Sequence, residues 1–415
     1  MSLAKRLRPR ESKLIANKHR ILNRVFREPG CSRFYLAKRL NINASTMGNY
    51  VENFLNAGVL IEDHPGPTRR GRSPVPLWLN PRYGGFLGID LEALRVRTVL
   101  TDFAGDVVAQ HEIPLRAGLG REAVLDVMVA AAQQTAQAGG DRRLLAIGVA
   151  APGRIDFRTG RIVRYDLLPG FHDVSLIDCL RPHFDCPIYI EENIRALTLA
   201  ELLRGGGRGH CHFLCLAARS GFGMGIVVDG KMYLGHNDLA GKIGQNVVPR
   251  DGRTPTFTEL VSAKGIIGRA LRAMTDAVPR TPQYARLLES PADVTLADLV
   301  AAADDRLIHD LLEQAGRDLG LIAANLANLF APEKIILAGE VPSCCPLVRR
   351  TLEETFRRYT IEEVLRDLVL ADSTLSGFAG ALGAAHLGFL KTFPEDEIAL
   401  ALENGRHQTV LAAGG

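Results

Sequence analysis

The hydrophobic pattern of the first part of the chain changes its period several times. Apolar side chains recur at helical spacing in three consecutive segments, which are separated by Pro29-Gly30 and by the turn Asn41-Ile42-Asn43. Two short apolar runs follow, on either side of a loop rich in Gly, Pro and Arg. Three helices and a hairpin in this order predict a winged helix-turn-helix domain. The predicted helices span 12–27, 32–40 and 44–56, and the predicted strands span 59–61 and 76–79.

From Phe86 onward, apolar strands alternate with helices, which predicts an α/β class for the rest of the chain. The strand–turn–strand around the turn 103–106 is typical of an actin-like (RNase H-like) domain. We expect two lobes that divide near residue 195, with a small-residue helix near the C-terminus returning to the first lobe. The expected domains are 1–82 (DNA-binding, with its wing and linker), 83–391 (the two-lobed body) and 392–415 (a tail).

The overall composition is that of a protein with an ordinary apolar core. Apolar residues make up 47% and charged residues 23% of the 415 residues. No run reaches the roughly 18 apolar residues of a membrane helix, and the basic N-terminus lacks the apolar segment of a secretory signal. The seven cysteines are odd in number and scattered, which favours reduced thiols. We therefore expect a cytoplasmic protein with no membrane partner.

Charge is distributed unevenly along the chain. Residues 1–83 carry 16 Lys and Arg against 5 Asp and Glu, whereas the remainder carries 34 against 41. A basic head on an acidic body is typical of a protein whose one end binds a polyanion. Double-stranded DNA is the expected partner, and a solvated basic segment without a partner is the alternative.

The third predicted helix offers short polar side chains to DNA. Its early outer positions carry hydroxyls and one amide that suits adenine. Gly48 is costly inside a helix, so we expect a close approach of a protein or DNA backbone there. The loop arginines suit phosphates or a narrow minor groove. For each of these residues a solvated surface position is the alternative. The expected DNA contacts are Arg33, Asn43, Ser45, Thr46, Asn49, Tyr50, Arg69, Arg70 and Arg72.

Five motifs follow one another along the chain: GRSPVPLWLNP, GIDLEALR, IEENIRALTLAELL, RSGFGMG and AGKIGQ. In this order they resemble motifs of the ROK family of repressors, open reading frames and kinases. More narrowly, the chain resembles the regulators exemplified by the N-acetylglucosamine and xylose repressors, over roughly residues 12–390. This resemblance implies an actin-like body behind a winged helix-turn-helix head.

The resemblance also implies that the kinase chemistry of the family is lost. The paired glycines of the family's first phosphate loop are Glu92 and Ala93 here, and the position of the general base is Asn193. An amide side chain cannot act as a base near neutral pH. Glu192 precedes it at a strand end and is expected to point to the other face. We therefore expect no enzymatic activity.

The family's sugar and metal ligands are changed as well. At the positions of its sugar-binding glutamate and its zinc-binding histidine stand Lys242 and Gln245. The cysteines that hold zinc in relatives are missing, because no cysteine lies between Cys215 and Cys344. We expect no metal and no cofactor.

These observations lead to a DNA-binding repressor of carbohydrate-related genes, which we expect to form a homodimer or homotetramer. The effector pocket is expected between the lobes, where the positive charge of Arg219 and Lys242 favours an anionic, sugar-derived effector. Two alternatives stay open: a carbohydrate kinase with a regulatory head, and a regulator that responds to no effector. The expected effector-binding residues are Glu192, Asn193, Arg219, Lys242 and Gln245.

Overall fold

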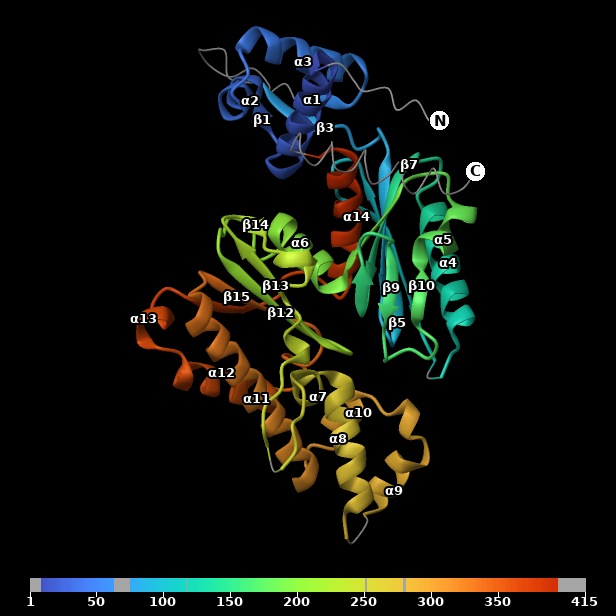
Figure 1. The fold of residues 1–415 in the computed structure, drawn as a ribbon, viewed down its shortest axis with the longest axis vertical. Coiled ribbons are helices and arrows are strands. Elements are labelled where there is room, and N and C mark those ends of the chain that lie inside the picture. Colours follow the sequence, from blue (N-terminus) through green and yellow to red (C-terminus); the bar gives the residue numbers. More distant parts are fainter. Residues whose placement is uncertain (1–8, 63–74, 117, 251, 279–280, 395–415) are drawn as a thin grey trace.

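The computed structural model describes residues 9–62, 75–116, 118–250, 252–278 and 281–394. Figure 1 shows a small head at one end of the molecule and two larger lobes, each built around its own sheet. The C-terminal helix, drawn in red, lies against the sheet of the first lobe and reaches the head.

The head contains the three helices and the hairpin that the sequence predicts. Ser32 and Asn43 are N-caps, because their side chains accept hydrogen bonds from Tyr35 N at 3.2 Å and Thr46 N at 2.8 Å. The small antiparallel sheet has the order β1-β3-β2. Its two-residue strand β1 was not predicted, because two residues show no period. The elements are α1 Pro9–Arg27, β1 Cys31–Ser32, α2 Arg33–Leu40, α3 Ala44–Asn56, β2 Leu60–Glu62 and β3 Pro76–Leu79.

The first lobe contains a five-stranded sheet with the order β11-β7-β4-β5-β6 and a separate three-stranded sheet with the order β10-β9-β8. Strand β4 pairs parallel with β7 and antiparallel with β5. Every residue of β4 is buried, as expected for a central strand that is covered on both faces. The elements are β4 Gly85–Leu91, β5 Arg95–Asp102, β6 Val107–Pro114, α4 Arg121–Ala138, β7 Leu144–Ala151, β8 Arg154–Asp156, β9 Arg161–Arg164, β10 His172–Ser175, α5 Leu176–Leu180 and β11 Ile188–Glu192.

The second lobe is a five-stranded sheet with the order β14-β13-β12-β15-β16. Its core lies between this sheet and a layer of helices in which α11 and α12 pack side by side (Figure 1). The elements, with α6 between the two sheets, are α6 Asn193–Arg204, β12 Phe213–Ala218, β13 Phe222–Val228, β14 Lys231–Met232, α7 Phe257–Val261, α8 Ala263–Asp276, α9 Pro282–Glu289, α10 Leu296–Ala301, α11 Arg306–Phe330, β15 Lys334–Ala338, α12 Pro346–Tyr359, α13 Glu362–Leu365 and β16 Val369–Asp372.

Helix α14 (Ala379–Thr392) packs directly on the first-lobe sheet. A Cβ added at Gly88 of β4 would overlap Ala381 O, and one added at Gly148 of β7 would overlap Ala384 O. Only glycine therefore allows this close approach, and the small residues of α14 meet it from the other side. The chain thus crosses to the second lobe and returns to the first at its C-terminal helix.

The head and the first lobe share one hydrophobic core. Phe26 of α1 stacks on Phe389 of α14, with ring centroids 4.0 Å apart. The Arg204 guanidinium lies over the Phe26 ring, 4.9 Å from its centroid, and donates to Ala104 O at 2.9 Å. The junction is therefore a packed interface between the head and the first lobe.

The α/β class and the positions of the head helices are confirmed. Among the residues described, no helix combines the length and the apolar character needed to cross a bilayer.

Candidate functional site

The outer face of α3 is exposed. Ser45 and Asn49 are both exposed and stand about one helical turn apart, so they lie on the same face. Gly48 lies on this face beside them, and a Cβ added there would meet nothing within 4 Å. No backbone within the described chain approaches Gly48, so a close approach by the protein itself does not explain this glycine.

Tyr50 is buried, and the prediction that it contacts DNA is wrong. Its side chain is only 6% exposed, on the inner face of α3 with Met47 and Phe54. The hydroxyl accepts a hydrogen bond from Asn17 Nδ2 at 3.3 Å. Tyr50 follows Met47 by three residues, so the helical period carries it into the core. The prediction relied on the polar hydroxyl group, whereas the helical period determines that the Tyr50 side chain is buried.

Three other predicted DNA contacts lie at the head surface, and two of them already bind groups of the head through their side chains. The side-chain oxygen of Asn43 is engaged in capping α3, while the backbone N–H of Thr46 is its donor. Arg33 donates to Glu62 Oε1 at 2.7 Å and also lies 3.7 Å from Glu52 Oε2. Its charge is therefore partly neutralised within the head.

The arginine-rich loop joins two paired strands. Leu60 of β2 faces Leu79 of β3 across the hairpin. Arg69, Arg70 and Arg72, predicted to contact phosphates or the minor groove, lie outside the described residues.

A buried ion cluster closes the cleft between the lobes. Arg219, which follows β12 of the second lobe, donates to Asp90 Oδ2 at 2.6 Å and to Glu92 Oε1. Both carboxylates come from the end of β4, and Glu92 also pairs with Arg97 at 3.2 Å. Burial raises the pKa of Asp90, and the adjacent Arg219 opposes this shift. The cluster holds the lobes together through groups of the chain itself.

A second interlobe ion pair lies where the sequence places the sugar site. Lys242 pairs with Glu192 and donates to Gly153 O at 3.0 Å. Glu192 is 3% exposed and ends β11. Its carboxylate reaches across to Lys242 of the second lobe. Lys242 thus contacts two groups of the first lobe.

Arg195 is a buried residue of this region that the sequence reasoning missed. It lies 2.7 Å from Glu191 Oε1, and its guanidinium lies 4.5 Å from the centroid of the Phe157 ring. Burial raises the pKa of Glu191, and Arg195 opposes this shift. No clear signal in the sequence marks this pair, because Glu191 lies in β11 and Arg195 in α6, so the helical spacing of paired charges does not apply.

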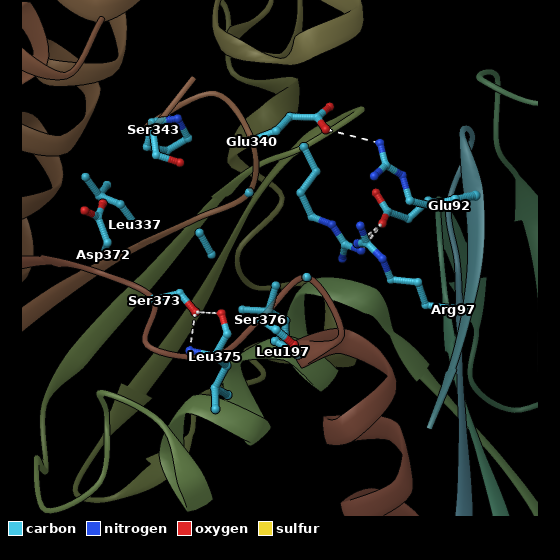
Figure 2. A pocket seen from close by; sticks show the side chains of 17 residues that line it. Glu92, Arg97, Leu197, Leu337, Glu340, Ser343, Asp372, Ser373, Leu375 and Ser376 are labelled. Atoms are coloured by element: carbon cyan, nitrogen blue, oxygen red, sulfur yellow. Dashed lines mark hydrogen bonds and ion pairs between the residues drawn. The ribbon is translucent and has the colours of Figure 1, made fainter. Parts of the chain in front are cut away.

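The remaining cleft holds a cavity of about 300 Å³. Figure 2 shows Glu92 and Arg97 on one side of it, Ser343 and Ser373 on the other, and Glu340 and Ser376 between them. Arg95 pairs with Glu340 across the lobes at 3.3 Å. Asn193 begins α6 and is half-buried, whereas Gln245 is exposed. Of the predicted effector residues, Glu192 and Lys242 pair with each other. Arg219 pairs instead with Asp90 and Glu92.

The pairing removes the reason for an anionic effector at Arg219 and Lys242. The prediction treated both as free positive charges, but each is neutralised by buried carboxylates. An anion there would have to displace Asp90, Glu92 or Glu192 and leave buried charge without a partner, which costs several kcal/mol. These cations therefore stabilise the closed cleft.

All seven cysteines are free thiols. Within the part of the chain that the structure describes, no group of three or more His, Cys, Asp or Glu is placed to hold a metal ion.

Known proteins resemble this chain over most of its length. A family model described as ROK family matches residues 86–389. A xylose repressor from Caldicellulosiruptor bescii is 24% identical over 395 residues, covering 91% of this chain and 97% of the repressor. A glucokinase from Halalkalibacterium halodurans is 27% identical over 314 residues, covering 73% and 94%. The crystal structure of a ROK family transcriptional regulator, a homologue of the E. coli Mlc protein, matches with a TM-score of 0.73 at 22% identity, covering 94% and 98%.

Proposed function

The chain belongs to the ROK family, and from this premise we propose that it is a transcriptional repressor of carbohydrate-related genes. The similarity to the xylose repressor carries this proposal, because it covers 91% of the chain and so includes most of the head. The glucokinase covers only 73%. A repressor that matches the chain beyond its ROK domain supports DNA binding by the head.

We infer that residues 1–82 form a winged helix-turn-helix. Helices α2 and α3 with the β2–β3 hairpin have the required order, and α3 carries the exposed Ser45 and Asn49. We propose that α3 enters the major groove and that Asn49 contacts a base. The other proposed DNA contacts, which bind phosphates or position the helix, are Arg33, Asn43, Thr46, Arg69, Arg70 and Arg72.

We propose that residues 83–391 form the body, followed by a tail at 392–415, and that this body does not transfer phosphate. Asn193 has no basic group, and the Glu192 carboxylate beside it is held by Lys242. Glu92 stands at a glycine position of the family's phosphate loop, and its carboxylate is held there by Arg219 and Arg97. Incubation with ATP and glucose, xylose or N-acetylglucosamine is expected to give no sugar phosphate, and product that survives Asn193→Ala but disappears in Asp90→Ala would overturn this part.

We propose that the repressor acts as a homodimer or homotetramer. A two-fold symmetric pair of heads reads an operator with inverted half-sites, spaced by about one helical turn of DNA or a multiple of it.

Selection of the full chain against a pool of random duplex DNA tests the proposed function. The expected result is an enriched inverted repeat whose binding weakens steeply with salt, because the basic head displaces counterions from phosphates. Footprinting on genomic DNA then identifies the neighbouring genes. A pool without enrichment after repeated rounds would overturn the proposal.

A further inference from the structure

A second cavity, of about 300 Å³, lies between the two lobes outside the charged cleft. The first lobe contributes the β4–β5 turn, including Ala93 and Leu94, and the loop 166–169. The second lobe contributes Lys264 at the start of α8. This cavity and the cleft cavity share no lining residue. Its volume is at the lower end of the range of small-molecule sites.

Most of the residues that line this second cavity have apolar side chains, and three are charged. Leu94, Leu115, Leu119 and Leu168 line it, and Leu115 and Leu168 are buried. The leucine side chains offer no donors or acceptors to a ligand, so its polar contacts must come from Arg116, Asp166 and Lys264, and an apolar part of it can lie against the leucines. They fit an apolar body.

Lys264 brings positive charge to these walls without a carboxylate partner among the described residues. Its Nζ donates to Leu167 O at 3.0 Å, which leaves two further N–H groups. Burial lowers its pKa. Asp166 also lines the cavity, but its carboxylate accepts from Arg164 Nε at 2.5 Å. Arg116, exposed at the rim, likewise has no acidic partner within the described chain.

We propose that this cavity binds a small molecule with a single carboxylate on an apolar body. The carboxylate accepts hydrogen bonds from Lys264 Nζ, with Arg116 adding charge at the rim, and the apolar body fills the leucine-lined space. A charge-assisted hydrogen bond of this kind compensates the partly buried ammonium group. A phosphate ester with a hydroxylated body would also accept hydrogen bonds from Lys264, but its hydroxyl groups would lie against leucine side chains without hydrogen-bond partners.

The position of the cavity connects it to the ion cluster of the cleft. Along the β4–β5 turn, Ala93 and Leu94 line this second cavity, while Glu92 and Arg95 line the cleft. A ligand that contacts both Lys264 and this turn therefore bridges the lobes beside the Glu92–Arg219 pair. Its role as the effector of the repressor rests on the proposed function, whereas the binding itself does not.

Calorimetric titration of the full chain with phenylacetate and with hexanoate tests the proposal, with phenylacetamide and hexanamide as neutral counterparts. At least one acid is expected to bind, and its amide at least tenfold more weakly. Lys264→Met is expected to weaken the acid at least tenfold, and Arg116→Gln less. Lys231→Met, at an exposed lysine of β14, is the matched control and should bind as the unchanged chain does.

The proposal is overturned if neither acid binds, if the amides bind as well as the acids, or if Lys264→Met leaves the affinity unchanged. Tighter binding of glucose 6-phosphate than of both acids would also overturn it. DNA binding is measured separately on the same samples. Acid binding without DNA binding would contradict the proposed function alone, and DNA binding without acid binding would contradict this inference alone.

Discussion

The Phe26 ring of the head stacks on the Phe389 ring of α14, with planes inclined by 15°. The other end of α14 lies against the ion cluster, because a Cβ added at Gly380 would overlap the Asp90 carboxylate. One helix thus contacts both the head and the buried carboxylate that Arg219 binds. We expect a change in the cleft to reach the head through this helix.

Arg219→Ala is expected to lower the free energy of unfolding by about 3–5 kcal/mol, because it leaves Asp90 and Glu92 buried without their partner. Urea unfolding measures the change. Arg158→Ala is the control, since the Arg158 side chain is 91% exposed and its pair with Asp156 contributes little. Equal losses in the two variants would show that the cluster does not hold the lobes together.

Gly105→Ala is expected to loosen the head from the first lobe. A Cβ there would lie 2.7 Å from Phe26 Cε2, and the residue has φ +90°. Gly230→Ala is the matched control, because Gly230 also has a positive φ (+68°) but nothing within 4 Å of an added Cβ. Both variants lose about 1 kcal/mol or more from backbone strain, and Gly105→Ala loses about 1–3 kcal/mol further by overpacking. Thermal unfolding compares them, and losses of equal size would contradict the packed junction.

Acidification is expected to weaken the same junction through His386. Burial lowers the pKa of His386 to about 3, and its Nε2–H donates to Gly105 O at 3.2 Å. The unfolded chain takes up a proton near its ordinary pKa of 6.5, whereas the folded chain does not. The contribution is therefore fully present above pH 6.5 and is lost as the pH falls toward 3, by up to about 1.4 kcal/mol per pH unit.

Urea unfolding at pH 7 and pH 5 checks this pH dependence. His386→Gln keeps a donor for Gly105 O and does not titrate, so its stability should change less between the two pH values. An identical change in both proteins would exclude His386 as the cause.

Local features of the sequence predict the head well. Ser32 and Asn43 cap their helices as expected, because capping depends on the next few residues alone. The helical period also predicts that Tyr50 is buried, but the prediction placed it at the surface because of its polar hydroxyl group. The residues near Arg219 in the sequence do not indicate which carboxylates it pairs with.

The cleft depends on contacts that the sequence does not display. Arg219 and Asp90 are 129 residues apart, and their pairing follows from how two lobes close. The sequence therefore indicated that Arg219 and Lys242 are free cations, whereas in the fold buried carboxylates neutralise both. The apolar cavity beside Lys264 arises in the same way, from a turn, a loop and a helix that are distant in the chain.

Gly48→Ala is expected to separate stability from DNA binding. Alanine in place of an open helical glycine should raise the free energy of unfolding by up to about 1 kcal/mol. The added methyl group lies on the face that carries Ser45 and Asn49, so DNA affinity is expected to fall. Urea unfolding and fluorescence anisotropy on the selected duplex measure the two effects. A more stable variant with unchanged affinity would place this face outside the DNA interface.

Fluorescence anisotropy of the full chain with the selected duplex and with a scrambled duplex, at several salt concentrations, tests the central claim most directly. Asn49→Ala is expected to weaken binding to the selected duplex by about 1–3 kcal/mol while scrambled DNA is bound as before. Asn246→Ala, at an exposed asparagine of the body, is the control and should change neither. Equal affinity of the unchanged protein for both duplexes, or the same discrimination after Asn49→Ala, would contradict sequence-specific binding through α3.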